Sequence, residues 1–252
     1  MRRSIIAALL LTVASWLHAA QLGPPRRVGP IGTAPAVTLL GTVLPFGDGH
    51  VTFTSQPMPN QTTLYNIVAT PIDHSGVVQY DKAKILVTGV SSAPLAAATD
   101  SGYLLCWTVQ KDVFTVALSP SLEPLANHVN SLGQVIAGRL ACNGSSCLLT
   151  TALNEIIPEG NSSLITLGAD GVPKNHIPLL RPGYAYQSSL APVKSGYAFA
   201  HGGTSSGTYA PGITWLDNDG NVIAETPLPG WLARAPAIAV HPAGALVIGS
   251  FA

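Results

Sequence analysis

Charged side chains are scarce in this sequence. Only 10% of its 252 residues are Asp, Glu, Lys or Arg, and the 12 basic residues balance the 12 acidic ones. An average soluble protein carries about 25% charged residues. No long run of Lys or Arg occurs, although a surface that neutralises nucleic-acid phosphates needs such a cluster. The composition therefore excludes a nucleic-acid-binding surface.

Metal-ligand spacings and long helix-forming stretches are also missing. The three cysteines form no paired Cys-x-x-Cys motif and the seven histidines show no ligand spacing, so no metal site and no cofactor are expected. The 25 glycines and 21 prolines disfavour long regular helices. Because 47% of the residues are hydrophobic, the chain is too apolar to be disordered. We therefore expect a folded, all-β chain.

Residues 1–20 have the pattern of a secretory signal peptide. Arg2 and Arg3 precede an apolar stretch over 5–17, and the small residues Ala19 and Ala20 mark the expected cleavage point. The alternative is a membrane anchor, but the apolar part is shorter than the roughly 20 residues that a bilayer requires. We therefore expect a secreted, periplasmic or cell-surface protein with no membrane span after signal cleavage.

Export changes the expected state of the three cysteines. Cys142 and Cys147 flank the turn sequence Asn-Gly-Ser-Ser. A hairpin there would hold their Cα atoms roughly 4.5–5.5 Å apart, which is within disulfide range. An oxidising compartment favours a local disulfide, with two reduced thiols as the alternative. Cys106 lies in an apolar run and is expected to be a buried, unreactive thiol.

An internal repeat organises the rest of the chain. The segment Leu167–Gly171 recurs 49 residues later as Leu216–Gly220. Offsets of 49 and then 46 residues toward the N-terminus lead to Leu118 and Ile72, each followed by turn-forming residues. The repeat predicts four copies of one hairpin turn, at Ser75-Gly76, Pro120-Ser121, Asp170-Gly171 and Asp219-Gly220.

A second motif repeats in step with these turns. It is a turn followed by a short apolar run, as in Ser101–Trp107 and Ser195–Ala200, with related runs that begin at Asp48, Ser146 and Gly244. Another apolar run precedes each of these turns, so each unit contains four short strands. Continuous rather than alternating apolar runs are typical of sheets that are covered on both faces.

Repeated units of four antiparallel strands in about 40–50 residues are the sequence signature of a β-propeller. Tandem immunoglobulin-like domains would need about 100 residues each, and a closed eight-stranded barrel would not explain a repeat every four strands. Residues 37–252 are therefore expected to form a propeller-like array, after a Pro/Gly-rich segment at 21–36. The array has about four full blades, and 237–251 supplies two strands of a fifth. Either the segment after Pro30 completes this blade, or the ring closes in a longer chain.

The repeat resembles that of secreted bacterial β-propeller proteins. Their blades carry Gly-x-Tyr-Leu-Val-x-Trp, followed by a strand that ends in Asp-x-Asp-Gly. Ser101–Trp107 and Leu216–Gly220 are similar to these two pieces, and Cys142 with Cys147 resembles a cysteine-stapled hairpin of some such blades. The resemblance covers roughly 37–252 and implies a fold, but no activity.

Two motifs suggest chemistry but have a simpler structural explanation. Gly203–Gly207 fits the Gly-x-Ser-x-Gly elbow of α/β-hydrolases, with Asp217 and His241 downstream. That elbow joins a strand to a helix, and no helix is expected here. Asp217–Asn221 resembles a calcium loop, yet its twelfth position is Leu228 instead of an acidic residue. A Gly/Ser-rich loop and a hairpin turn explain the two segments better.

The loops between second and third strands, together with the links between units, should emerge on one face. Loop residues are free to contact a partner, whereas strand residues are used in packing. A binding or scaffolding module for a surface glycan or an exported protein is the function we expect, with Tyr209 as a stacking platform for a sugar. The expected ligand-binding residues are His201, Tyr209, Asn154 and Glu155.

The competing function is a propeller-fold hydrolase or lyase that acts on polysaccharide. Such chemistry normally uses two carboxylates that face each other about 5–9 Å apart. The loops offer Glu155, Glu159 and Asp112 as candidates, and none of them lies in a motif. No catalytic residue is therefore assigned.

Overall fold

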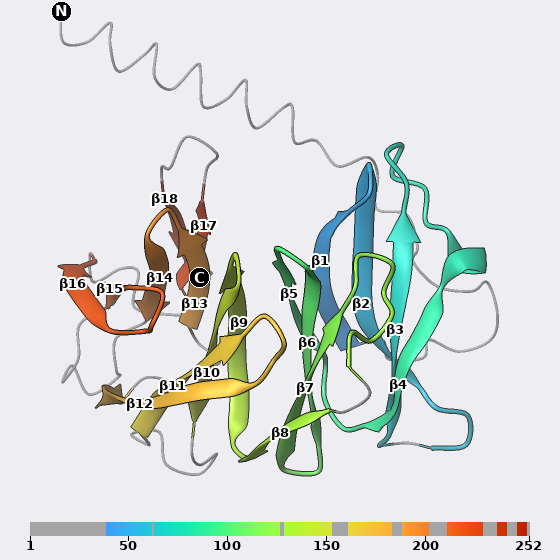
Figure 1. Cartoon of the computed structure of the whole chain (residues 1–252), viewed down its shortest axis with the longest axis horizontal. Coiled ribbons are helices and arrows are strands. Elements are labelled where there is room, and N and C mark those ends of the chain that lie inside the picture. Colours follow the sequence, from blue (N-terminus) through green and yellow to red (C-terminus); the bar gives the residue numbers. More distant parts are fainter. Residues whose placement is uncertain are drawn as a thin grey trace, which may run out of the picture. The chain divides into compact units, whose positions relative to one another are not determined.

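The structure is a computed structural model, and the part of it that is described consists almost entirely of β-strands (Figure 1). The predicted signal peptide and the segment 21–36 lie outside the described residues. The described residues are 39–61, 63–126, 129–152, 161–182, 188–201, 211–228, 236–240 and 246–250.

The strands form antiparallel sheets in which chain order and spatial order agree. The first sheet contains β1 (Leu39–Phe46), β2 (Gly49–Pro57), β3 (Tyr65–Ile72) and β4 (Lys84–Val90). The second contains β5 (Leu95–Thr99), β6 (Gly102–Val109), β7 (Asp112–Leu118) and β8 (Asn130–Gln134). The third contains β9 (Ile136–Asn143), β10 (Ser146–Ala152), β11 (Asn161–Gly168) and β12 (Pro173–Pro182). The fourth contains β13 (Ser188–Val193), β14 (Gly196–His201), β15 (Gly212–Leu216) and β16 (Val222–Pro227), and the fifth contains β17 (Pro236–Val240) and β18 (Leu246–Ser250).

The predicted organisation into four-stranded units is confirmed. Four sheets have four strands each, and two strands of a fifth follow them. Within the described part of the chain the only helical element is a short 3-10 turn, η1 (Tyr80–Lys82). The expectation of an all-β chain with almost no helix is thus also confirmed.

The four predicted turns share one hydrogen-bonding pattern. In each, the residue that follows or ends the third strand donates its N–H to the carbonyl four residues later, at 2.7–3.0 Å. The turns therefore close alike although their sequences differ. The donor and acceptor pairs are Asp73 with Val77, Ser119 with Glu123, Gly168 with Val172, and Asp217 with Asn221.

A left-handed backbone is required at the fourth position of this turn. Gly76, Gly171 and Gly220 supply it, with φ of 81°, 79° and 83°. In the second turn Leu122 takes this conformation at φ 66°, which is costly for a residue with a Cβ. Its side chain is 2% exposed and packs into the core between the first two sheets. Burial of this leucine explains why the turn tolerates it.

The second, third and fourth sheets each contribute side chains to two buried clusters, as the continuous apolar runs predict. In β6, Tyr103, Leu105 and Trp107 belong to the core shared with the first sheet. The alternate residues Leu104 and Cys106 belong to the core shared with the third sheet. Cys106 is a free, buried thiol, as expected, and burial raises its pKa to about 12.

Hydrogen bonds between first strands also join neighbouring sheets. The N–H of Ala96 in β5 donates to Thr42 Oγ1 in β1 at 3.3 Å. The N–H of Ile238 in β17 donates to Ser189 Oγ in β13 at 3.1 Å. β9 in turn contacts both β5 and β13, so the first strands follow one another from sheet to sheet.

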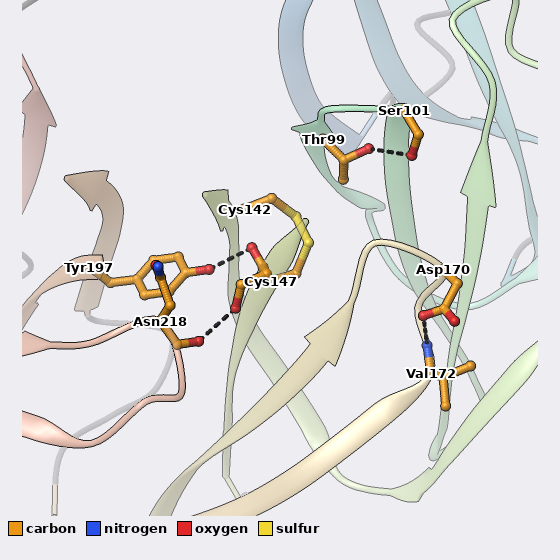
Figure 2. The surroundings of a disulfide bond; sticks show 9 residues. Thr99, Ser101, Cys142, Cys147, Asp170, Val172, Tyr197 and Asn218 are labelled. Atoms are coloured by element: carbon orange, nitrogen blue, oxygen red, sulfur yellow. Dashed lines mark hydrogen bonds between the residues drawn. A yellow bond between two sulfur atoms is a disulfide. The ribbon is translucent and has the colours of Figure 1, made fainter. Parts of the chain in front are cut away.

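The predicted disulfide joins Cys142 to Cys147 across the β9–β10 hairpin (Figure 2). The two residues are direct cross-strand partners, and their Cα atoms lie 4.0 Å apart, slightly closer than expected. Figure 2 also shows Tyr197 and Asn218 of the fourth sheet reaching this hairpin. Ser146 accepts at its carbonyl from Tyr197 and donates its hydroxyl to the Asn218 carbonyl, both at 2.6 Å.

Candidate functional site

Of the four residues expected to contact a ligand, only His201 lies in the described part of the chain. It is the last residue of β14 and is 8% exposed, so it belongs to the strand and not to the loop that follows. Asn154, Glu155 and Tyr209 lie outside the described residues. The structure therefore describes the strand end beside these loops, and not the loops themselves.

The imidazole of His201 packs between a ring and a glycine. Its centroid lies 5.8 Å from that of Phe199, with an angle of 32° between the ring planes. Gly212 is its cross-strand partner in β15, and a Cβ placed there would lie 3.2 Å from two imidazole ring atoms. A glycine at this position therefore leaves room for the histidine ring at the sheet end.

Arg139 reaches the same end of the fourth sheet from β9 of the third. Its Nε donates to the carbonyl of Ser188 at 2.9 Å, and Ser188 is the cross-strand partner of His201. Its backbone N–H donates to Thr150 Oγ1 at 2.8 Å. We call Arg139, Thr150, Ser188 and His201 the 139/201 cluster.

The 139/201 cluster combines buried polar groups with an exposed cation. Thr150 and Ser188 are 0% and 3% exposed, whereas Arg139 is exposed. Arg139 is the only charged side chain on the described first strands β1, β5, β9, β13 and β17. A guanidinium is permanently charged and presents planar N–H donors, which suit carboxylates and hydroxyl oxygens. Sequence reasoning missed Arg139, and its only signal was one charge within an otherwise uncharged strand.

The cluster lies next to the loops that sequence reasoning singled out. β10 ends at Ala152 and β11 begins at Asn161, so this connection carries Asn154 and Glu155. β14 ends at His201 and β15 begins at Gly212, so that connection carries Tyr209. The strand ends of the third and fourth sheets thus place the 139/201 cluster beside the roots of both connections.

A serine and a histidine form a hydrogen bond on the third sheet. Ser163 Oγ lies 2.7 Å from His176 Nε2, and 2.7 Å from Thr151 Oγ1. A nucleophile with its base would have such a bond. Ser163 is only 2% exposed, however, and no described carboxylate bonds to the imidazole. These three residues therefore act as a polar tie across β10, β11 and β12.

The residues of the hydrolase-like pattern are only partly described. Gly203–Gly207 and His241 lie outside the described residues. Asp217 belongs to the fourth turn, where its carboxylate accepts from the N–H groups of Asp219 and Asn221 at 2.9 and 2.8 Å. Burial alone would raise its pKa, but hydrogen bonds from Asn221 and the turn backbone outweigh it and lower the pKa. Turn geometry thus accounts for this aspartate.

The sequence matches no family model and no curated protein. In the described ranges no helix has the length and apolar character needed to cross a membrane. We therefore infer a function from the contacts and charges of the described residues alone.

Proposed function

We propose that the protein is an exported β-propeller-type repeat protein that binds a surface glycan or another exported protein. The loop end of the third and fourth sheets, beside the 139/201 cluster, is the binding surface. The observation that carries this proposal is Arg139, an exposed cation among first strands that are otherwise uncharged. Its position next to buried Ser188 and His201 provides several hydrogen-bonding groups in one place.

The propeller arrangement is supported by the way the sheets follow one another. Successive four-stranded sheets share apolar cores, and their first strands contact one another. The disulfide between Cys142 and Cys147 supports export, because such bonds persist in oxidising compartments. The tyrosines Tyr103 and Tyr197 and the third and fourth turns form hydrogen bonds with neighbouring sheets, so their role is structural. We therefore place ligand recognition at the strand ends and loops.

Glycan-array binding by the purified protein tests this proposal. Binding should weaken in Arg139→Gln and in the double variant Tyr209→Ala with Glu155→Ala. The matched control is Lys82→Gln, which removes a charge from the exposed turn η1. Circular dichroism must show that every variant stays folded. Full binding by both the Arg139 variant and the double variant would place the site elsewhere.

The alternative of a polysaccharide hydrolase or lyase gains no geometric support. Of its three candidate carboxylates only Asp112, the first residue of β7, is described. Glu155 and Glu159 lie outside the described residues. Release of reducing or unsaturated sugar ends from a bound polysaccharide would favour this alternative over a binding module.

A further inference from the structure

The first sheet differs from the others because its two faces carry different side chains. One face packs against the second sheet through Val51, Phe53 and Ile67. Side chains alternate between the faces along a strand, so the residues between these lie on the opposite face. Among the described residues this opposite face contributes to no apolar cluster. Its polar members are Thr52, Thr54, Gln56, Asn66, Thr70 and Thr88.

Three of these polar side chains form a row across the sheet, at the end that carries the β2–β3 loop. Gln56 of β2 is the cross-strand partner of Asn66 in β3, and Asn66 is the partner of Thr88 in β4. The Cβ atoms of direct cross-strand partners lie about 4.5–5.5 Å apart. Gln56 and Thr88 are exposed, and Asn66 is half-buried between them. We call these three residues the 56/66/88 row.

Asn66 has a buried acceptor that no described residue satisfies. Its Oδ1 atom is buried and has no hydrogen-bond partner, and it is the only such side-chain atom in the described part of the chain. A buried acceptor without a donor is costly. Because buried polar groups are otherwise almost always paired, this one indicates that a donor comes from a bound ligand.

The chemistry of the 56/66/88 row fits a neutral ligand that is rich in hydroxyl groups. The two amides and the hydroxyl of the row can both donate and accept hydrogen bonds, as sugar hydroxyls do. No Asp, Glu, Lys or Arg lies among the cross-strand partners on this face, so a charged ligand would find no counter-charge. A further protein sheet fits less well, because the faces that join sheets in this protein are apolar and would leave the amides unpaired.

We propose that the 56/66/88 row binds a neutral polysaccharide, with a sugar hydroxyl that donates to Asn66 Oδ1. Gln56 and Thr88 bind neighbouring hydroxyls of the same polymer. Thr54 continues the polar face along β2, so a polymer gains contacts that a single sugar lacks. The row and the 139/201 cluster lie on different sheets, so this proposal does not depend on the proposed function.

Native affinity electrophoresis of the purified protein tests the proposal. Gels that contain hydroxyethyl cellulose, dextran or galactomannan present neutral polysaccharides, and gels with alginate present an anionic one. At least one of the neutral polymers should retard the protein. Any retardation by alginate should not respond to substitutions in the row, because the row carries no charge.

Three substitutions remove the polar groups of the row but keep the approximate size of each side chain. They are Gln56→Met, Asn66→Leu and Thr88→Val. Each should weaken binding of the neutral polymer about 2- to 10-fold, as expected for one hydrogen bond, and the triple variant should abolish it. Gln134→Met is the matched control, because Gln134 is an exposed glutamine of β8 on the second sheet. It should be retarded like the unmodified protein.

The stability of Asn66→Leu separates ligand binding from a structural role. Removal of an acceptor that the fold leaves unpaired relieves its cost, so the midpoint of urea unfolding without polysaccharide should not fall. A lower midpoint would show that the fold itself needs the asparagine, and it would overturn the proposal.

Four other results would also overturn it. The first two are that no neutral polymer retards the protein and that the triple variant is retarded like the unmodified protein. The third is an equal loss of retardation in Gln134→Met. The fourth is a dimer in sedimentation that the triple variant dissociates, which would identify a second copy of the chain as the occupant of this face.

Discussion

The hydroxyl of Tyr197 donates a hydrogen bond to the carbonyl oxygen of Ser146 at 2.6 Å, which ties β14 of the fourth sheet to β10 of the third. Burial raises the pKa of Tyr197, so the hydroxyl keeps its proton and remains a donor. Tyr103 makes the corresponding bond to the Pro45 carbonyl, also at 2.6 Å, and ties the second sheet to the first. The repeated Gly-Tyr sequence is therefore a tie between sheets.

Removal of either tyrosine hydroxyl should destabilise the protein. Tyr103→Phe and Tyr197→Phe keep the ring in place but delete the bond, and each should lower the free energy of unfolding by about 1 kcal/mol. The control Tyr80→Phe changes an exposed tyrosine of η1 and should have no effect. Urea unfolding followed by circular dichroism measures the difference. Equal stability of all three variants would show that the inter-sheet hydrogen bonds of Tyr103 and Tyr197 do not stabilise the protein.

Replacement of the glycine before the tyrosine should be more costly than replacement of an open glycine. Gly196 has φ 149°, and a Cβ there would overlap the carbonyl oxygen of Leu216. Gly47 has φ 57° but no atom within 4 Å of its Cβ position. Gly196→Ala should therefore destabilise by about 1–3 kcal/mol more than Gly47→Ala, as expected for forced overpacking. Thermal unfolding of both variants gives the comparison.

Leu122→Gly should destabilise although it restores the glycine of the other turns. Relief of the left-handed conformation gains about 1–2 kcal/mol. Loss of a buried leucine side chain costs about 2–5 kcal/mol, so the loss dominates. The free energy of unfolding should fall by about 1–3 kcal/mol in a denaturant titration. A stabilised variant would show that the Leu122 side chain adds little to the core.

Stability should decline in acid through the turn aspartate Asp73. A hydrogen bond from the Ser75 hydroxyl, followed by one from the Val77 N–H, lowers its pKa from 3.8 to about 2. Because the folded pKa lies below the unfolded one, this stabilisation is present above about pH 4 and is lost as the pH falls toward about 2. The midpoint of urea unfolding measured across this range should show the decline.

Asp73→Ser provides the matched control for this pH dependence. In the second turn Ser119 occupies the equivalent position, and its Oγ accepts from the Glu123 N–H at 3.1 Å. A serine at position 73 can therefore keep a hydrogen bond without a titrating group. The acid-dependent loss should be smaller in this variant. An unchanged pH profile would assign the decline to other carboxylates.

Native alkylation should label none of the three cysteines. Cys142 and Cys147 are bonded and are 8% and 0% exposed, and the thiol of Cys106 is 0% exposed. After unfolding without reductant, only Cys106 should react, as mass spectrometry can show. Loss of the disulfide should cost less than the typical value of about 2–4 kcal/mol, because it closes a short loop. Native labelling of Cys142 or Cys147 would contradict the bond.

The repeated turns and the disulfide could be predicted because their requirements are local. A left-handed position within a few residues, or two cysteines across a short hairpin, is visible in the sequence. The partners of Asn143 are not local: its amide donates to the Val193 carbonyl at 3.0 Å and to Asn218 Oδ1 at 2.9 Å. Those acceptors are 50 and 75 residues away in the chain, so no sequence motif joins them.

The candidate site could be predicted only in part for the same reason. His201 was expected among the loop residues that are free to contact a partner. It is instead the last residue of β14, and its ring packs on Phe199 and beside Gly212. Arg139 stands in an apolar and small-residue strand without any motif. Its importance follows only from the approach of β9 to β13, which depends on the packing of the two sheets.

The tyrosine ties have a consequence for how the protein unfolds. Each joins one sheet to the sheet before it, as do the bonds between first strands, so the cohesion of the array is a sum of nearest-neighbour contributions. In such a system the cooperativity of unfolding is set by the weakest junction and not by the total stability. A junction that lost its shared apolar core as well as its tyrosine bond would separate unfolding into two transitions, with intact sheets on either side.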